Sequence, residues 1–72
     1  MTVKQDLQKA LATAESAQGT YAQFANSTQD QNAKQMFQQM EQDMSRHIQV
    51  LSSRLNLVQE ENQLNRQQGG QQ

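Results

Sequence analysis

The feature that most constrains this chain is the spacing of its apolar residues, which recur at three- and four-residue steps in two segments separated by a short polar stretch. Such spacing places apolar side chains along one face of an α-helix. No proline interrupts either segment, and glutamine, present 17 times, is a good helix former. The sequence therefore predicts an all-α protein made of two amphipathic helices.

The first helix is predicted over about residues 3–26. Thr2 and Gln5 have the spacing of a capping box, in which each side chain bonds the backbone N–H of the other residue. Gly19 falls on the polar side, where glycine weakens a helix without ending it. The predicted inner face consists of Val3, Leu7, Ala10, Ala14, Ala17, Tyr21 and Phe24, widened by Leu11 and Ala25.

The polar stretch from Asn26 to Asp30 predicts a turn, because short polar side chains compete for backbone hydrogen bonds. Either Ser27 with Asp30 or Thr28 with Gln31 can cap a second helix over about residues 29–64. So short a connection predicts an antiparallel αα-hairpin over residues 1–65. Residues 66–72 contain no apolar side chain and are predicted to form a disordered glutamine- and glycine-rich tail.

The second helix carries more apolar residues than one neighbouring helix can cover. Its predicted inner face consists of Ala33, Phe37, Met40, Met44, His47, Leu51, Leu55 and Val58, with Met36 and Ile48 beside it. Val50, Leu57 and Leu64 form a further line, seven residues apart and about a quarter turn away. An isolated hairpin leaves the outer half of both faces wet.

We therefore predict that two chains pair into a four-helix bundle, since 72 residues with 12 Leu, Ile, Val and Phe supply little core for a monomer. The competing interpretation is an unstructured glutamine-rich segment, but its apolar residues would be scattered instead of regularly spaced. The predicted interface comprises Leu7, Leu11, Tyr21, Phe24, Phe37, Met40, Met44, Ile48, Leu51, Leu55, Leu57 and Val58.

Composition argues against several classes of partner. A net charge of −1 does not provide the phosphate contacts that a nucleic-acid-binding protein needs. The longest apolar run, Ala10 to Ala12, is far too short for direct membrane insertion, and the start of the chain lacks the pattern of a signal peptide. We expect a cytoplasmic protein. Without cysteine there is neither a disulfide nor a thiolate site.

His47 is the one histidine, and Asp43 and Glu41 precede it on the second helix. Asp43 and His47 share a helix face and are candidate metal ligands, but two ligands do not make a site. A histidine hydrogen-bonded inside a bundle is the favoured interpretation, and a metal shared across a dimer is the alternative. Met36, Met40 and Met44 suit a flexible core filler better than an adaptable binding surface.

No combination of residues predicts catalysis, and no cofactor is expected. The serines lack the second histidine or lysine that would activate a nucleophile. Gly69 and Gly70 follow no strand and precede no helix, so they do not form a phosphate-binding loop. We therefore expect a protein that is not an enzyme.

Residues 21–25 and 33–37, followed by His47, resemble one hairpin of ferritin-like, rubrerythrin-type proteins. In that family a phenylalanine precedes a Glu-x-x-His metal motif by seven residues, as Phe37 precedes Met44 here. The resemblance implies a helical bundle. It also implies the loss of di-iron chemistry, because Met44 and Ala14 stand where the family has its carboxylates.

Several longer stretches resemble the small bacterial proteins of the domain-of-unknown-function 1657 family, over about residues 1–65. They are residues 1–7, 14–17, 19–21, 27–31, 33–37, 46–47 and 51–55. Members occur in endospore-forming bacteria, often encoded beside spore-germination channel proteins of the stage V sporulation A type. The resemblance implies a sporulation setting, in the forespore or spore interior, as an accessory to a spore membrane protein at the inner membrane.

Three hypotheses follow from the residues and the resemblance. The first and favoured one is a structural or protein-interaction module, a dimeric bundle whose apolar line or glutamine-rich face docks on another protein. The second is a carrier of a metal or small ligand that uses His47 with Asp43 or Glu41 at the dimer interface. The third is a helix pair that opens onto a membrane surface, which the shortage of lysine on its polar faces disfavours.

Overall fold

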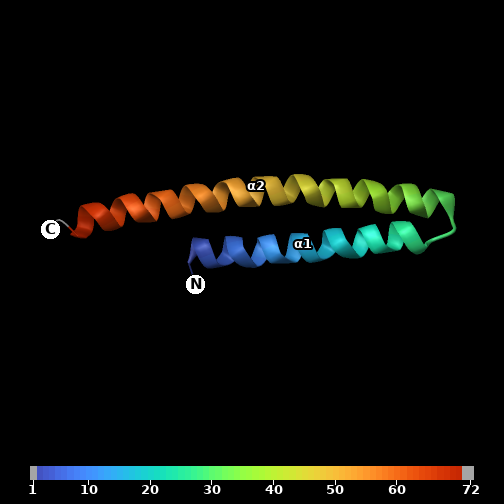
Figure 1. Ribbon diagram of the computed structural model, residues 1–72, viewed down its shortest axis with the longest axis horizontal. Coiled ribbons are helices and arrows are strands. Elements are labelled where there is room, and N and C mark those ends of the chain that lie inside the picture. Colours follow the sequence, from blue (N-terminus) through green and yellow to red (C-terminus); the bar gives the residue numbers. More distant parts are fainter. Residues whose placement is uncertain (1, 71–72) are drawn as a thin grey trace.

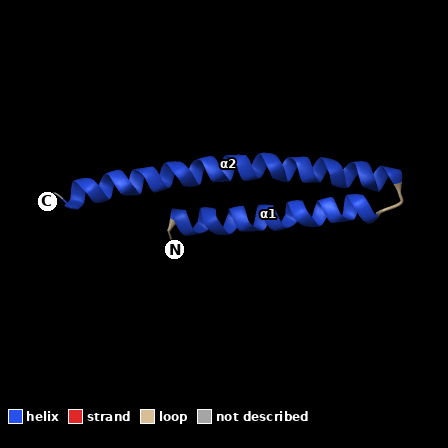
Figure 2. Ribbon diagram, viewed as in Figure 1, coloured by secondary structure: helices blue, strands red, loops and turns tan. Residues whose placement is uncertain are grey.

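The structure is a hairpin of two long antiparallel helices, α1 (Val3–Ser27) and α2 (Gln31–Gly70), drawn in Figures 1 and 2. This computed structural model describes the backbone of residues 2–70 and the side chains of residues 2–61. The two helices lie side by side along α1, and α2 extends well beyond the start of α1 (Figure 1). The predicted all-α hairpin is confirmed, and the described residues contain no strand.

The start of α1 forms the predicted capping box. The backbone N–H of Gln5 donates to the Thr2 hydroxyl at 3.1 Å, and the backbone N–H of Thr2 donates to Gln5 Oε1 at 3.1 Å. These bonds satisfy donors that have no partner within the helix. Gly19 is exposed with open space around its Cα, as expected for the polar side.

The turn lies within the predicted polar stretch, between Ser27 and Gln31, but the residue that caps α2 differs from the predicted ones. Asp30 caps α2, because its Oδ2 accepts from the Ala33 N–H at 3.2 Å. Ser27 is the last residue of α1, and the Thr28 N–H closes that helix by donating to the Phe24 carbonyl at 2.9 Å. The predicted caps Ser27 and Thr28 are wrong because both residues end the first helix instead of starting the second.

Most of the buried and half-buried residues follow a seven-residue repeat, which is typical of the contact line between helices in coiled coils. We call these contact positions the seam. In α1 the seam comprises Lys4, Leu7, Leu11, Ala14, Gln18, Tyr21 and Ala25, and Thr28 continues it just after the helix. In α2 the seam comprises Lys34, Phe37, Glu41, Met44, Ile48, Leu51, Leu55 and Val58. All are half-buried or buried. Lysine and glutamate fit because their aliphatic stems cover the seam while the charged ends reach water.

A side-chain hydrogen bond and an aromatic cluster also join the two helices. Gln18 Nε2 donates to Ser45 Oγ at 2.5 Å across the two helices. Near the turn, the Phe37 ring lies 5.3 Å from that of Phe24 and 6.4 Å from that of Tyr21, measured between centroids. Such aromatic pairs add stability beyond the area that they bury. They hold the turn end of the hairpin together.

The predicted inner faces are partly wrong, because the seam uses a neighbouring line of residues. Val3, Ala10, Phe24, Met36 and His47 were all expected on the inner faces and are exposed. The prediction used apolar residues alone. The helices instead bury a line that contains Leu11 and Ile48 and also polar residues such as Gln18. A single neighbouring helix covers only a narrow strip of its partner, and that strip cannot include both lines.

Two predictions concern residues outside the described side chains. Leu64, the third member of the outer apolar line, lies there, as do the side chains of the predicted tail at residues 66–72. Neither helix, over its described residues, combines the length and the apolar character that a bilayer crossing requires.

Candidate functional site

The hairpin buries very little. Among residues 2–61, only Ala14 and Ala25 are buried, at 7% and 3% exposure. Several large apolar side chains are instead exposed to solvent, and the most exposed are Val50 at 67% and Val3 at 62%. The others in the described part of the chain are Phe24, Met36 and Leu57. Burial of such side chains is the main stabilising contribution in a small protein, so this surface is the first candidate for function.

These exposed side chains gather on one side of the hairpin. In each helix, one line of residues begins just before the first seam residue, Lys4 in α1 and Lys34 in α2, and recurs every seven residues. These two lines flank the seam on the same side, because the helices are antiparallel. In α1 that line is Val3, Ala10, Ala17 and Phe24, and in α2 it is Ala33, Met40, His47 and Arg54. Met36, Asp43, Val50 and Leu57 lie three or four residues from members of the α2 line, and therefore next to it. We call this surface the apolar flank.

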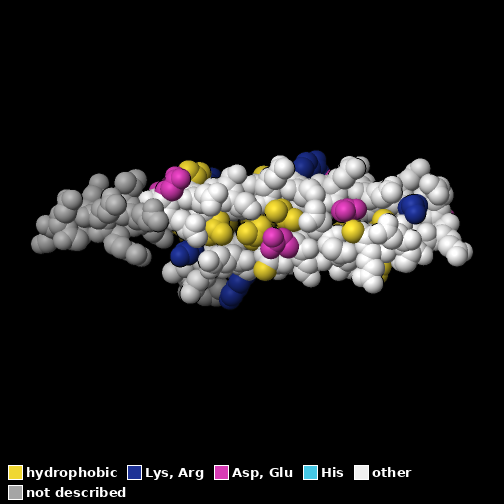
Figure 3. Space-filling model, viewed as in Figure 1, with side chains coloured by type: hydrophobic (Ala, Val, Ile, Leu, Met, Phe, Trp, Pro, Cys, Tyr) yellow, Lys and Arg dark blue, Asp and Glu magenta, His cyan; other side chains and the backbone are white. Residues whose placement is uncertain are grey.

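The other side of the seam is polar. We call it the glutamine flank, and its α2 residues are Gln35, Gln38, Gln42, Ser45, Gln49, Ser52, Asn56 and Gln59. None of these side chains is charged. Figure 3 shows one broad face of the molecule that is mostly white, the colour of the backbone and of side chains that are neither charged nor hydrophobic, with most of the visible hydrophobic side chains near the middle. Along α2, the two flanks therefore differ sharply in chemistry.

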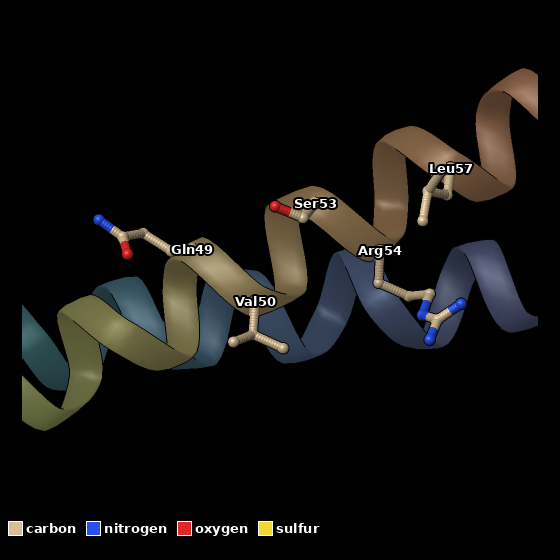
Figure 4. Close-up of a pocket in the computed structure, with 5 residues that line it drawn as sticks. All are labelled: Gln49, Val50, Ser53, Arg54 and Leu57. Carbon is tan, nitrogen blue, oxygen red and sulfur yellow. The ribbon is translucent and has the colours of Figure 1, made fainter.

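Two grooves mark the α2 part of the apolar flank. One has a volume of about 360 Å³ and is lined by Arg46, His47, Val50 and Leu51. The next, of about 340 Å³, is lined by Gln49, Val50, Ser53, Arg54 and Leu57. In Figure 4, Val50, Arg54 and Leu57 project in a similar direction from α2, whereas Gln49 and Ser53 project away from them. Both grooves are shallow and open, which suits a protein surface better than an enclosed small ligand.

The predicted metal ligands do not come together within one chain. Asp43 Oδ1 accepts from Gln39 Nε2 at 3.0 Å and pairs with the Arg46 guanidinium, so its nearest partners are not other ligands. In the part of the chain with described side chains, no three His, Asp or Glu residues form a group that could hold a metal ion. A metal site shared between two chains stays a prediction.

His47 differs from its favoured interpretation. It is exposed and lines a groove, and within residues 2–61 it has no hydrogen-bond partner. Within the single hairpin, His47 is therefore outside the core, and a histidine hydrogen-bonded inside a bundle of two chains stays a prediction. Ile48, one position later, occupies the seam instead, because the seven-residue repeat passes through it.

The predicted interface residues divide into two groups. Phe24 and Leu57 lie on the apolar flank and are 44% and 48% exposed. The other ten are half-buried, and one of them, Met40, also belongs to the apolar flank. Val3, Met36 and Val50 are exposed apolar residues that the predicted interface omits. Val3, Ala10, Ala17 and Phe24 recur every seven residues. This spacing is the feature of the sequence that could have predicted the α1 part of the apolar flank.

The fold and this surface define a class: a coiled-coil hairpin with one uncovered apolar flank. A family model described as Protein of unknown function (DUF1657) matches residues 7–55, and the chain belongs to that family. The match covers most of the α1 helix and the part of α2 that packs against it. No curated protein and no solved structure matches the chain.

Proposed function

We propose that this protein is a non-enzymatic interaction module that acts as a homodimer, in which two hairpins cover each other's apolar flanks and form a four-helix bundle. The observation that carries the proposal is the exposure of Val3, Phe24, Met36, Val50 and Leu57 on a chain with only two buried residues among those described. Four-helix bundles enclose a core between two such layers. The glutamine flanks then stay outside, free to meet a further protein.

The mass of the protein in solution, followed across a dilution series with helical content, tests this proposal. We expect a dimer at micromolar concentration, and we expect helical circular dichroism to fall as the dimer dissociates, because the isolated hairpin loses the burial that stabilises it. Sedimentation equilibrium and circular dichroism on the same samples measure both quantities. A monomer that keeps full helicity at every concentration would contradict the proposal.

For the biological setting, we infer a spore-associated accessory role, supported by the resemblance of residues 1–65 to a family that occurs in endospore-forming bacteria. The protein would lie in the forespore or spore interior, beside a membrane protein of the inner spore membrane. Immunoblots of growing cells, sporulating cells and purified spores of the source bacterium test this setting. Accumulation during sporulation is the expected result, and equal amounts in growing cells with none in spores would count against it.

A further inference from the structure

We propose that a two-fold axis perpendicular to the helices relates the two hairpins of the dimer. The axis lies between the two hairpins. It passes α1 at the level between Thr13 and Ala14, and it passes α2 at the level between Ile48 and Gln49. This inference rests on the proposed homodimer and adds its interface and register. A two-fold interface requires each surface to be complementary to itself. Both helices of the apolar flank meet that requirement about the same axis.

The α1 line has a symmetric order of side-chain sizes. Val3, Ala10, Ala17 and Phe24 are evenly spaced, with a large residue at each end and alanine at both inner positions. Antiparallel pairing about the midpoint of this line places Val3 against the partner subunit's Phe24. It also places Ala10 against the partner subunit's Ala17, where the small side chains let the two helices approach closely.

The α2 part of the apolar flank is complementary to itself in charge. About a midpoint between Ile48 and Gln49, Asp43 lies opposite the partner subunit's Arg54, and this pair forms twice. Arg54 has no ion-pair partner in the described part of its own chain, and the interactions of Asp43 there use only Oδ1. The same register places Met40 opposite the partner subunit's Leu57. Moving the midpoint to Val50 would place Asp43 against that leucine instead.

The same axis relates both helices to their copies, because the midpoint of the α1 pattern and that of the α2 pattern lie at the same level of the hairpin. Gln18 is bonded to Ser45, which fixes the level of α1 against α2. The α1 midpoint lies about one helical turn before Gln18, and the α2 midpoint lies about one turn after Ser45. Since the helices are antiparallel, these steps lead in the same direction. The size pattern of α1 and the charge pattern of α2 thus indicate one axis independently.

The area of the paired face is sufficient for a stable dimer. The molecule is 18 Å broad across the hairpin, and α1 has 25 residues. At a rise of 1.5 Å per residue the paired length is about 37 Å, so the faces of two chains together cover roughly 1,300 Å². Stable protein interfaces bury about 1,200–2,000 Å². A second copy of this chain therefore fits the flank in size as well as in pattern.

Disulfide cross-linking tests the register, since the natural chain contains no cysteine. We expect an oxidised mixture of Ala10→Cys and Ala17→Cys chains to form a covalent dimer between the two variants, while either variant alone forms little. In the proposed register, the two copies of position 10 are about 10 Å apart along the helices, which exceeds the Cα separation of about 7 Å that a disulfide spans. Non-reducing electrophoresis and mass spectrometry identify the linked pair.

A matched control uses Ala12→Cys mixed with Gly19→Cys, which have the same seven-residue spacing. These residues follow the α1 seam by one position, as the α2 residues of the glutamine flank follow the α2 seam, and so lie on that flank. Both positions are exposed, and a Cβ at Gly19 meets nothing within 4 Å. No covalent dimer is expected from this mixture. Efficient linkage of the control pair, or of Ala10→Cys with itself, in a sample that sediments as a dimer would overturn the register and leave the homodimer intact. A sample that sediments as a monomer would overturn both proposals.

A charge exchange tests the α2 side independently. We expect Asp43→Arg and Arg54→Asp each to weaken dimerisation about tenfold, because each variant opposes like charges twice across the axis. The chain that carries both substitutions should recover most of the affinity, since the pair is restored with the charges reversed. Additive losses in the double variant would contradict the proposed pairing.

Discussion

A double variant with both Val50 and Leu57 replaced by aspartate is expected to dimerise at least 100-fold more weakly than the natural protein. Both side chains line the grooves of the apolar flank and are largely exposed in the single hairpin. Burial of a valine or leucine contributes about 1.5–3 kcal/mol, and each substitution acts twice in a two-fold dimer. A loss of about 3 kcal/mol corresponds to a factor of more than 100 in the dissociation constant, which sedimentation equilibrium measures.

The matched control is the double variant Gln35→Asp and Gln42→Asp. Both residues are exposed, line neither groove and lie seven residues apart, so the control adds the same charge with the same spacing on the glutamine flank. We expect its dissociation constant to stay within a few-fold of that of the natural protein. Equal weakening by the two double variants would show that added charge, and not the apolar flank, disrupts the dimer.

Replacement of Phe37 by alanine has the second large expected effect, which is on folding. The Phe37 ring contacts those of Tyr21 and Phe24 and joins the two helices near the turn. Phenylalanine-to-alanine changes in cores cost about 3–5 kcal/mol, and the lower value applies here because Phe37 is half-buried. A protein of this size has only a few kcal/mol of stability, so thermal unfolding followed by circular dichroism should lose its cooperative transition at moderate temperature.

Gln38→Ala is the control for this variant. Gln38 is the next residue along α2, is exposed, and is replaced by alanine, a slightly better helix former. Its midpoint of thermal unfolding should differ little from that of the natural chain. If the Phe37 variant melted at the same temperature as this control, the aromatic cluster would not be what holds the turn end of the hairpin together.

The sequence predicted well what depends on neighbours along the chain. The capping box of Thr2 and Gln5 was correct because its partners are three residues apart. The turn was placed correctly for a similar reason, although Asp30 and not Ser27 or Thr28 caps α2. Several short polar residues can each cap a helix, so the identity of the cap depends on where the first helix ends.

The candidate site was predicted in part. The line that contains Val50 and Leu57 was expected to lie outside the hairpin, and both residues are exposed. Val3 and Phe24 were expected inside and lie outside as well, so the uncovered surface is broader than predicted. His47 was expected in the core for the same reason, since an apolar pattern in one dimension does not distinguish two adjacent lines on a helix.

By itself, therefore, the sequence determined the two helices, the cap at the start of the first, the antiparallel turn and the excess of apolar surface, because local hydrogen bonds and periodicity encode all of these. Only the tertiary structure decided which line of each helix faces the other. That choice depends on how two whole surfaces fit together. The lines through Leu11 and Ile48 meet with Gln18 bonded to Ser45, and the lines through Val3 and His47 are left on the apolar flank.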